Sequence, residues 1–96
     1  MNLIPGVQTR TTDGVIGTSG KPIRVFSIHI ISGGTASVLA VYNGTGTNGT
    51  QLLSLTGTLS TGATFNFAGG FRFSAGCYLD VDSNVTSVSV SYTEEF

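Results

Sequence analysis

Two apolar runs rich in β-branched residues, residues 23–31 and 36–43, lie on either side of the small-residue loop Ser-Gly-Gly-Thr at 32–35. Strand-like runs joined by a short glycine-centred loop are typical of a β-hairpin, and we predict one here. Successive side chains of a strand point to opposite faces. One face of the hairpin therefore receives Phe26, Ile28, Ile30, Leu39 and Val41, and the other receives Val25, Ser27, His29, Ile31, Val38, Ala40 and Tyr42.

Both faces of this predicted hairpin carry apolar side chains. A strand that is apolar on both sides is usually covered on both sides. A chain of 96 residues forms one domain with a modest core, so it has little material for a second cover. The pattern therefore predicts that another subunit covers the second face.

Short alternating segments separated by glycine-rich turns make up the rest of the chain. The alternation is clearest at residues 63–67, 71–73, 77–81 and 88–92, with Gly69-Gly70 as a break. No segment keeps a helical period over ten residues. About eight short strands at this spacing predict an all-β fold, an antiparallel β-sandwich with no substantial helix. Its middle is predicted to be filled by Phe65, Phe67, Phe71 and Phe73.

The first twelve residues are predicted to be an N-terminal arm, and residues 13–96 to form the sandwich. Leu3, Ile4 and Val7 are apolar, but Pro5-Gly6 interrupts a regular element. Three interpretations stay open for this segment: an edge strand at residues 7–11, a loosely held terminus, or an arm that docks on a neighbouring subunit.

Charged residues are scarce. They make up 9% of the chain, against a norm of about 25%, and mixed surface charge is what keeps most proteins apart in solution. The composition therefore favours an oligomer or a lattice. The four basic residues are scattered, which argues against a nucleic-acid partner. We also expect no membrane partner, because no apolar run is long enough to span a bilayer, and no secretion signal, because the first residues lack a basic segment followed by an apolar stretch.

Candidate catalytic residues are few. His29 is the single histidine and Cys77 the single cysteine, and Cys77 falls in the apolar set of a strand, where a buried inert thiol is the usual case. Asp80 and Asp82 are two apart, so they are predicted to lie on one face about 7 Å apart. The sequence Asp-Val-Asp-Ser-Asn lacks the spacing and the distant glutamate of a calcium loop. We predict no catalytic, cofactor-binding or metal-binding residue, and hence no enzyme, although a cation at the two aspartates stays an open alternative.

Tyrosines give the main competing interpretation. Tyr42, Tyr78 and Tyr92, with the Ser/Thr/Asn loops, are residues of the kind that bind sugars by stacking and neutral hydrogen bonds. A carbohydrate-binding module is therefore kept as an alternative.

The stretch G-G-F-R-F-S-A-G-C-Y-L-D-V-D-S-N-V-T-S-V-S-V-S-Y, residues 69–92, resembles small all-β structural proteins from the virions of tailed bacteriophages. The segments A-S-V-L-A-V-Y-N-G-T and L-L-S-L-T-G extend this resemblance to residues 23–92. It implies a jelly-roll-like sandwich that serves as a decoration or cement subunit on a capsid, commonly as a trimer, or as part of a tail or fibre. It implies no catalytic residue.

The resemblance, together with the scarcity of charge, implies a non-enzymatic virion structural protein, made in the host cytoplasm, that would bind copies of itself and the major capsid protein or another virion protein. No cofactor is expected. The predicted subunit interface comprises Leu3, Ile4, Val7, Val25, Ser27, His29, Ile31, Val38, Ala40 and Tyr42. The alternative is a carbohydrate- or receptor-binding β-sandwich module, such as a phage fibre tip or a lectin-like domain.

Overall fold

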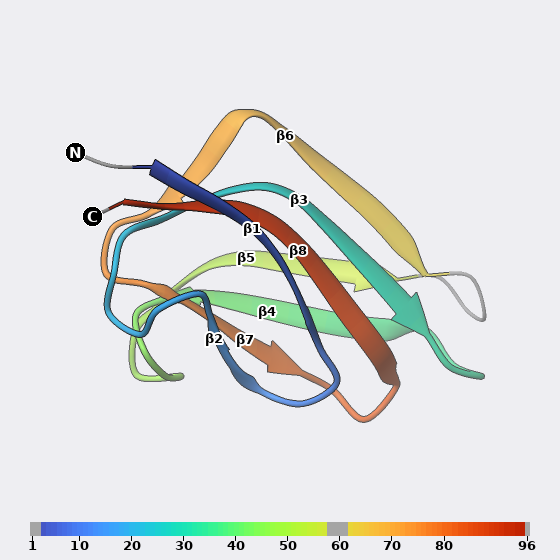
Figure 1. Ribbon diagram of the computed structural model, residues 1–96. Coiled ribbons are helices and arrows are strands. Elements are labelled where there is room, and N and C mark those ends of the chain that lie inside the picture. The colour runs from blue at the N-terminus through green and yellow to red at the C-terminus, as the bar shows by residue number, and fades with distance from the viewer. Residues whose placement is uncertain (1–2, 58–61, 96) are drawn as a thin grey trace.

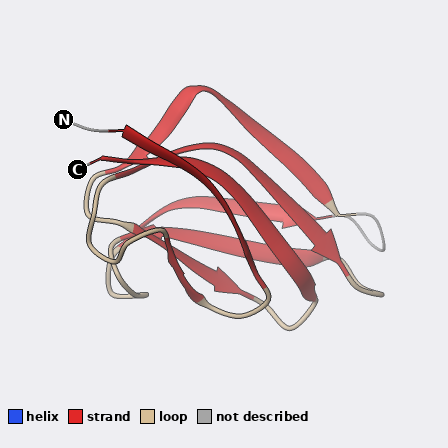
Figure 2. Ribbon diagram, in the orientation of Figure 1, coloured by secondary structure: helices blue, strands red, loops and turns tan. Residues whose placement is uncertain are grey.

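The computed structural model describes residues 3–57 and 62–95, with the backbone only for Leu3 and Ile4, and is built from strands and loops (Figure 2). The strands are β1 Leu3–Arg10, β2 Gly14–Ile16, β3 Ile23–Ser32, β4 Ser37–Asn43, β5 Thr50–Gly57, β6 Ala63–Phe73, β7 Cys77–Val81 and β8 Val85–Glu95. In the described part of the chain no helix is long and apolar enough to span a bilayer. The prediction of an all-β sandwich is confirmed.

Two antiparallel four-stranded sheets pack face to face (Figure 1). Sheet A has the order β1-β8-β3-β6, and sheet B has the order β2-β7-β4-β5. The pairs β1–β8, β2–β7, β3–β6 and β4–β5 are those of one long hairpin, which is rolled so that β8 lies beside β3 and β7 beside β4. Eight strands in this order form a jelly roll, as the resemblance implied.

The hairpin predicted at residues 23–43 is wrong. β3 belongs to sheet A and β4 to sheet B, so the loop between them crosses from one sheet to the other. The buried hydroxyls of Ser32 and Ser37 are 2.6 Å apart and hydrogen-bond across this crossing. They lie against Gly57, where the absence of a side chain leaves room for them. The two apolar runs therefore meet face to face through the core, and the actual hairpin turn is the loop at residues 44–49.

A β-bulge in β3 changes which side chains point inward. Against β8, Val25 lies opposite Tyr92 and Ser27 opposite Ser91, so Phe26 is the extra residue of β3. Against β6, Val25 lies opposite Phe71 and Ser27 opposite Asn66, so residues 67–70 of β6 lie opposite Phe26 alone. Gly69 and Gly70 have φ of 78° and 86°, and β6 bends sharply here without ending (Figure 1). Because of the extra residue in β3, Val25 is buried in the core and Phe26 is 36% exposed, the reverse of the prediction.

The core consists of buried aliphatic side chains, one cysteine and one phenylalanine. Phe73 is fully buried, but Phe65, Phe67 and Phe71 are only partly buried against the core, because β6 is an edge strand. The prediction that all four phenylalanines fill the middle is therefore wrong for three of them. The other core residues are Ile16, Ile23, Val25, Ile28, Ile30, Leu39, Val41, Cys77, Leu79, Val85, Val88 and Val90.

The segment predicted to be an arm contributes a strand to sheet A. β1 pairs with β8 along its whole length, from Leu3 opposite Glu95 to Arg10 opposite Val88. Pro5 is tolerated because β1 is an edge strand, where one side of the backbone has no neighbour. The ring of Tyr92 lies over Gly6, since a Cβ there would be 2.8 Å from the tyrosine hydroxyl oxygen. Residues 3–10 are thus part of the sandwich.

Candidate interaction surfaces

Two rows on the outer face of sheet A consist of uncharged side chains, while Arg24, Arg72 and Glu95 lie on the same face beyond the bulge at Phe26. One row across the four strands runs Thr9, Ser89, His29 and Thr64, and the next runs Val7, Ser91, Ser27 and Asn66. Thr9 Oγ1 lies 2.9 Å from Ser89 Oγ, and His29 Nδ1 lies 2.6 Å from Thr64 Oγ1. These hydrogen bonds join neighbouring strands. Neither row contains a carboxylate, a lysine or an arginine.

Three exposed apolar side chains project from this face. Val7 is 73% exposed, Ile31 is 41% exposed, and Phe26 projects at the bulge. The register places Ile31 opposite Ser87, so it continues the same outer face. Sheet A therefore presents Val7 and Ile31 among uncharged side chains, and Phe26 between these rows and Arg24.

The outer face of sheet B carries two tyrosines. Tyr42 and Tyr78 are paired across β4 and β7, with ring centroids 6.5 Å apart in an edge-to-face arrangement. Asp80 follows on β7, opposite Ala40, and Ala40 lies opposite Ser54 of β5. This face combines aromatic, carboxylate and hydroxyl groups.

The predicted interface residues do not form a single surface. Val7, Ser27, His29 and Ile31 lie on the outer face of sheet A, whereas Val38, Ala40 and Tyr42 lie on the outer face of sheet B, on the other side of the sandwich. Val25 is in the core and takes no part in either face. Leu3 and Ile4 lie in β1, and their side chains lie outside what the structure describes. The division follows from the crossing between β3 and β4.

One lateral side of the sandwich, formed by the edge strands β1 and β2, is sealed by polar side chains. Gln8 lies opposite the buried Val90, hence on the inner face of sheet A. Its Nε2 donates to the Val15 carbonyl at 3.2 Å, and its Oε1 accepts from the Gly17 N–H at 2.8 Å. The amide thus bonds to the backbone of β2 and of the residue that follows it, and links the two sheets.

Two further side chains extend this seal. Arg10 donates from Nε to the Thr12 carbonyl at 3.2 Å and from a terminal nitrogen to the Asp13 carbonyl at 3.0 Å. Glu94 of β8 accepts a hydrogen bond from the Thr18 N–H. We call this lateral side, with Gln8, Arg10 and Glu94, the sealed side.

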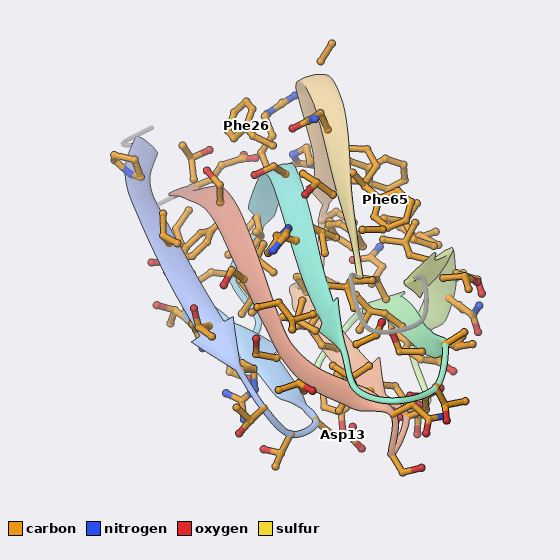
Figure 3. The ribbon with its side chains drawn as sticks, turned by 90° about the vertical axis from the view of Figure 1, so that its right-hand side faces the viewer. Asp13, Phe26 and Phe65 are labelled. Atoms are coloured by element: carbon orange, nitrogen blue, oxygen red, sulfur yellow. The ribbon has the colours of Figure 1, made fainter. Side chains whose placement is uncertain are left out.

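The opposite lateral side, formed by the edge strands β5 and β6, is lined with apolar side chains, and we call it the open side. The side chains that reach the core from these edges are Leu53, Leu55, Phe65, Phe67 and Phe71, all partly buried. Figure 3 shows Phe65 on the side of β6 that faces sheet B. Ring centroids of Phe67 and Phe71 are 5.8 Å apart, and those of Phe71 and Phe73 are 5.2 Å apart, so a chain of rings connects the edge to the core.

Carboxylates at the end of the sandwich hold loops together. Asp13, Asp82 and neighbouring residues line an open depression of about 490 Å³. Asp13 Oδ1 accepts from the Val81 N–H at 2.8 Å, and Asp82 accepts from the N–H groups of Val38 and Asn84 at 2.8 and 2.9 Å. Asp82 lies beyond the end of β7, whereas Asp80 lies within it. Among the described residues, no three His, Cys, Asp or Glu side chains are grouped so as to hold a metal ion.

Cys77 and His29 lie on different sides of sheet A. Cys77 is in the core between the sheets, and burial raises the pKa of its thiol to about 12. His29 is on the outer face of sheet A with Thr64. A thiolate–imidazole pair is therefore not assembled, and the thiol remains protonated at neutral pH.

Arg72 and Glu95 form a bidentate ion pair across β3, from β6 to β8. Arg72 Nε lies 2.9 Å from Glu95 Oε2, and a terminal nitrogen lies 3.2 Å from Oε1. The hydrogen bond and the charge of Arg72 lower the pKa of Glu95. The pair fixes the end of β6 that follows the bend.

Comparison of the sequence with protein-family models and with curated proteins finds no match. The candidate surfaces therefore rest on the geometry described above. Sequence reasoning missed both lateral sides. The F-x-F repeats at residues 65–67 and 71–73 were the sequence signal for the open side. Because β6 is an edge strand, its phenylalanines have a neighbouring strand on one side only.

Proposed function

We propose that this protein is a non-enzymatic structural subunit of a virion, which decorates or cements a capsid by binding copies of itself and the major capsid protein or another virion protein. The observation that supports it most is the outer face of sheet A. Its two rows of Ser, Thr, His and Asn include the exposed Val7 on β1, and the exposed Ile31 and Phe26 lie on β3 of the same sheet.

Uncharged rows of this kind suit a permanent contact. Burying an ion costs several kcal/mol unless it is well paired, and rows of uncharged side chains avoid that cost. Hydroxyl groups can exchange hydrogen bonds with water for hydrogen bonds with a partner, while Val7, Phe26 and Ile31 contribute apolar area. Such binding depends little on screened charges.

The fold is compatible with this role. Jelly rolls recur in viral capsid and lectin domains, although a fold by itself does not determine a function. The resemblance of residues 69–92 to virion structural proteins of tailed phages favours the capsid over the lectin class.

Light scattering tests the assembly. We expect a homo-oligomer, with a trimer as the copy number that the resemblance implies, and the same mass in low salt and in about 1 M NaCl, where screening reduces charge contacts. Dissociation in high salt would contradict the neutral contact. Peptide mass spectrometry of purified virions, and binding of the protein to capsids stripped of it, test the location; absence from the particle would reject the capsid role.

A second candidate is a carbohydrate- or receptor-binding module, and the pair Tyr42–Tyr78 beside Asp80 favours it. Tyrosine rings bind sugars through their faces, and a neighbouring carboxylate accepts hydroxyl hydrogen bonds. This function predicts a glycan-array signal that Tyr78→Ala removes and Thr64→Ala, on the other sheet, leaves unchanged. No signal for the wild type would reject it.

A further inference from the structure

The four sheet edges of this sandwich are protected unequally. Unpaired edge strands bind other strands unless they are short, bent, charged, interrupted by proline or covered. On the sealed side, β1 carries Pro5, β2 is three residues long, and Gln8 and Arg10 bond to the neighbouring backbone. Both edges of this side are therefore protected within the chain.

The open side lacks most of these devices. β5, with the sequence T-Q-L-L-S-L-T-G, contains no proline and no charged residue. A register shift places one bulged residue at Leu52, and from Leu53 to Gly57 the pairing with β4 is regular. The first half of β6, A-T-F-N-F-A at residues 63–68, is equally free of charge and proline, since Arg72 comes after the bend.

Side chains on this side also need a cover. Leu53 and Leu55 from β5, and Phe65, Phe67 and Phe71 from β6, remain partly exposed at the edge of the core. They belong to two sheets whose inner faces meet at this edge, so they form one apolar border between two strand edges that have no partner strand within residues 3–57 and 62–95. A partner that covers them must supply apolar side chains and an unpaired strand edge.

We infer that a second copy of this chain is that partner, and that two copies bind side on through their open sides. The inference rests on the proposed function, since it names the contact between copies. A strand edge pairs in antiparallel fashion with its own copy, because its unpaired N–H and C=O groups are then complementary. Like charges placed opposite each other would oppose such pairing, and these two segments contain none. A partner selected by charge would find no charge to bind there.

Lysine substitutions on the open side test the inference. Ser54→Lys on β5 and Ala68→Lys on β6 change exposed side chains outside the two rows of sheet A and add the charge with which natural edge strands prevent pairing. Thr11→Lys adds the same charge at an exposed position near the sealed side and is the matched control. We expect the first two variants to weaken self-association at least about tenfold, measured by sedimentation equilibrium, and Thr11→Lys to leave it unchanged.

Hydrogen exchange on the wild type tests the same contact without a variant, in case a lysine variant fails to fold. Amides of β5 and of residues 63–68 should become more protected as the protein concentration rises, while those of β1 and β2 should not. Association that survives both lysine substitutions, or protection in β5 and β6 that does not depend on concentration, would overturn the open-side contact and leave the virion role standing. A wild type that stays monomeric would overturn this contact and the self-assembly in the proposed function, while binding to stripped capsids would still decide the capsid role.

Discussion

The edge strands on the two lateral sides of the sandwich carry different kinds of side chain. At β1 and β2, the side chains of Gln8, Arg10 and Glu94 bond to backbone groups of the neighbouring loop and strand. At β5 and β6, leucines and phenylalanines end at the surface partly covered. A polar side chain that bonds to an edge satisfies it within the chain, whereas apolar side chains at an edge leave area for another molecule.

The difference also predicts where the fold tolerates change. The sealed side depends on a few directional hydrogen bonds whose loss leaves backbone groups unpaired. The open side depends on packing and on the glycines that shape β6. Substitutions can therefore separate the two sides.

The largest effect is expected at Gly62, the residue that precedes β6. Its φ is +75°, and a Cβ there would lie 1.8 Å from the Ile30 carbonyl oxygen, so alanine must displace the backbone of β3. We expect Gly62→Ala to lower the free energy of unfolding by at least about 4 kcal/mol, measured by urea denaturation.

Gly69→Ala is the control for Gly62→Ala. Gly69 has a similar φ of 78°, but no heavy atom lies within 4 Å of its Cβ position. Its replacement should cost only the left-handed conformation, about 1–2 kcal/mol. Equal losses of unfolding free energy in the two variants would show that overlap with the Ile30 carbonyl is not what makes Gly62 necessary.

The sealed side is tested by two glutamines in edge strands. Gln8→Ala leaves the Val15 carbonyl and the Gly17 N–H without their partner, which should cost about 1–3 kcal/mol. Gln51→Ala, on the exposed side of β5, should change stability by less than about 0.5 kcal/mol. Thermal unfolding of both variants measures the difference, and a cost at Gln51 as large as that at Gln8 would contradict the distinction between the sides.

Alternation was a sound guide wherever one face of a strand is buried. It assigned Cys77 and Leu79 of β7 and Val88 and Val90 of β8 to the core, and all four are fully buried. The register of β8 with β1 and that of β7 with β4 are regular throughout. Their burial follows from the period of two alone.

The failures have non-local causes. The inversion at Val25 and Phe26 depends on the register of β3 with β8, more than sixty residues later in the chain, where Phe26 has no partner between Tyr92 and Ser91. The crossing between β3 and β4 depends on which strands return to pair with them, which a Ser-Gly-Gly-Thr loop does not reveal. For the same reason the predicted interface residues were placed on one surface although the fold divides them between two. The role of Gln8 was also hidden, because it depends on two consecutive strands lying in different sheets.

Cys77 can report on the sealed side. It lies opposite Ile16 of the edge strand β2, and burial raises the pKa of its thiol to about 12, so the folded protein should resist thiol reagents at pH 8. Detachment of β2 would expose it. Gln8→Ala should therefore accelerate labelling of Cys77 under native conditions, by about tenfold for each 1.4 kcal/mol of lost local stability, while Gln51→Ala should not. Unchanged labelling in Gln8→Ala would mean that Gln8 does not hold β2 in place.

The smallest effect is expected at the ion pair that fixes β6 beyond its bend. Arg72 lowers the pKa of Glu95 in the folded state. A lowered folded-state pKa contributes stability that is complete above the unfolded-state pKa, about 4.3 for a glutamate, and is lost as the pH falls through the folded-state value. The wild type should therefore lose more stability than Glu95→Gln between pH 6 and pH 3, measured by urea denaturation at each pH. Arg72 is half-exposed, so the difference should be small and should shrink with added salt. Parallel pH curves for the two proteins would mean that the Arg72–Glu95 ion pair does not stabilise the end of β6.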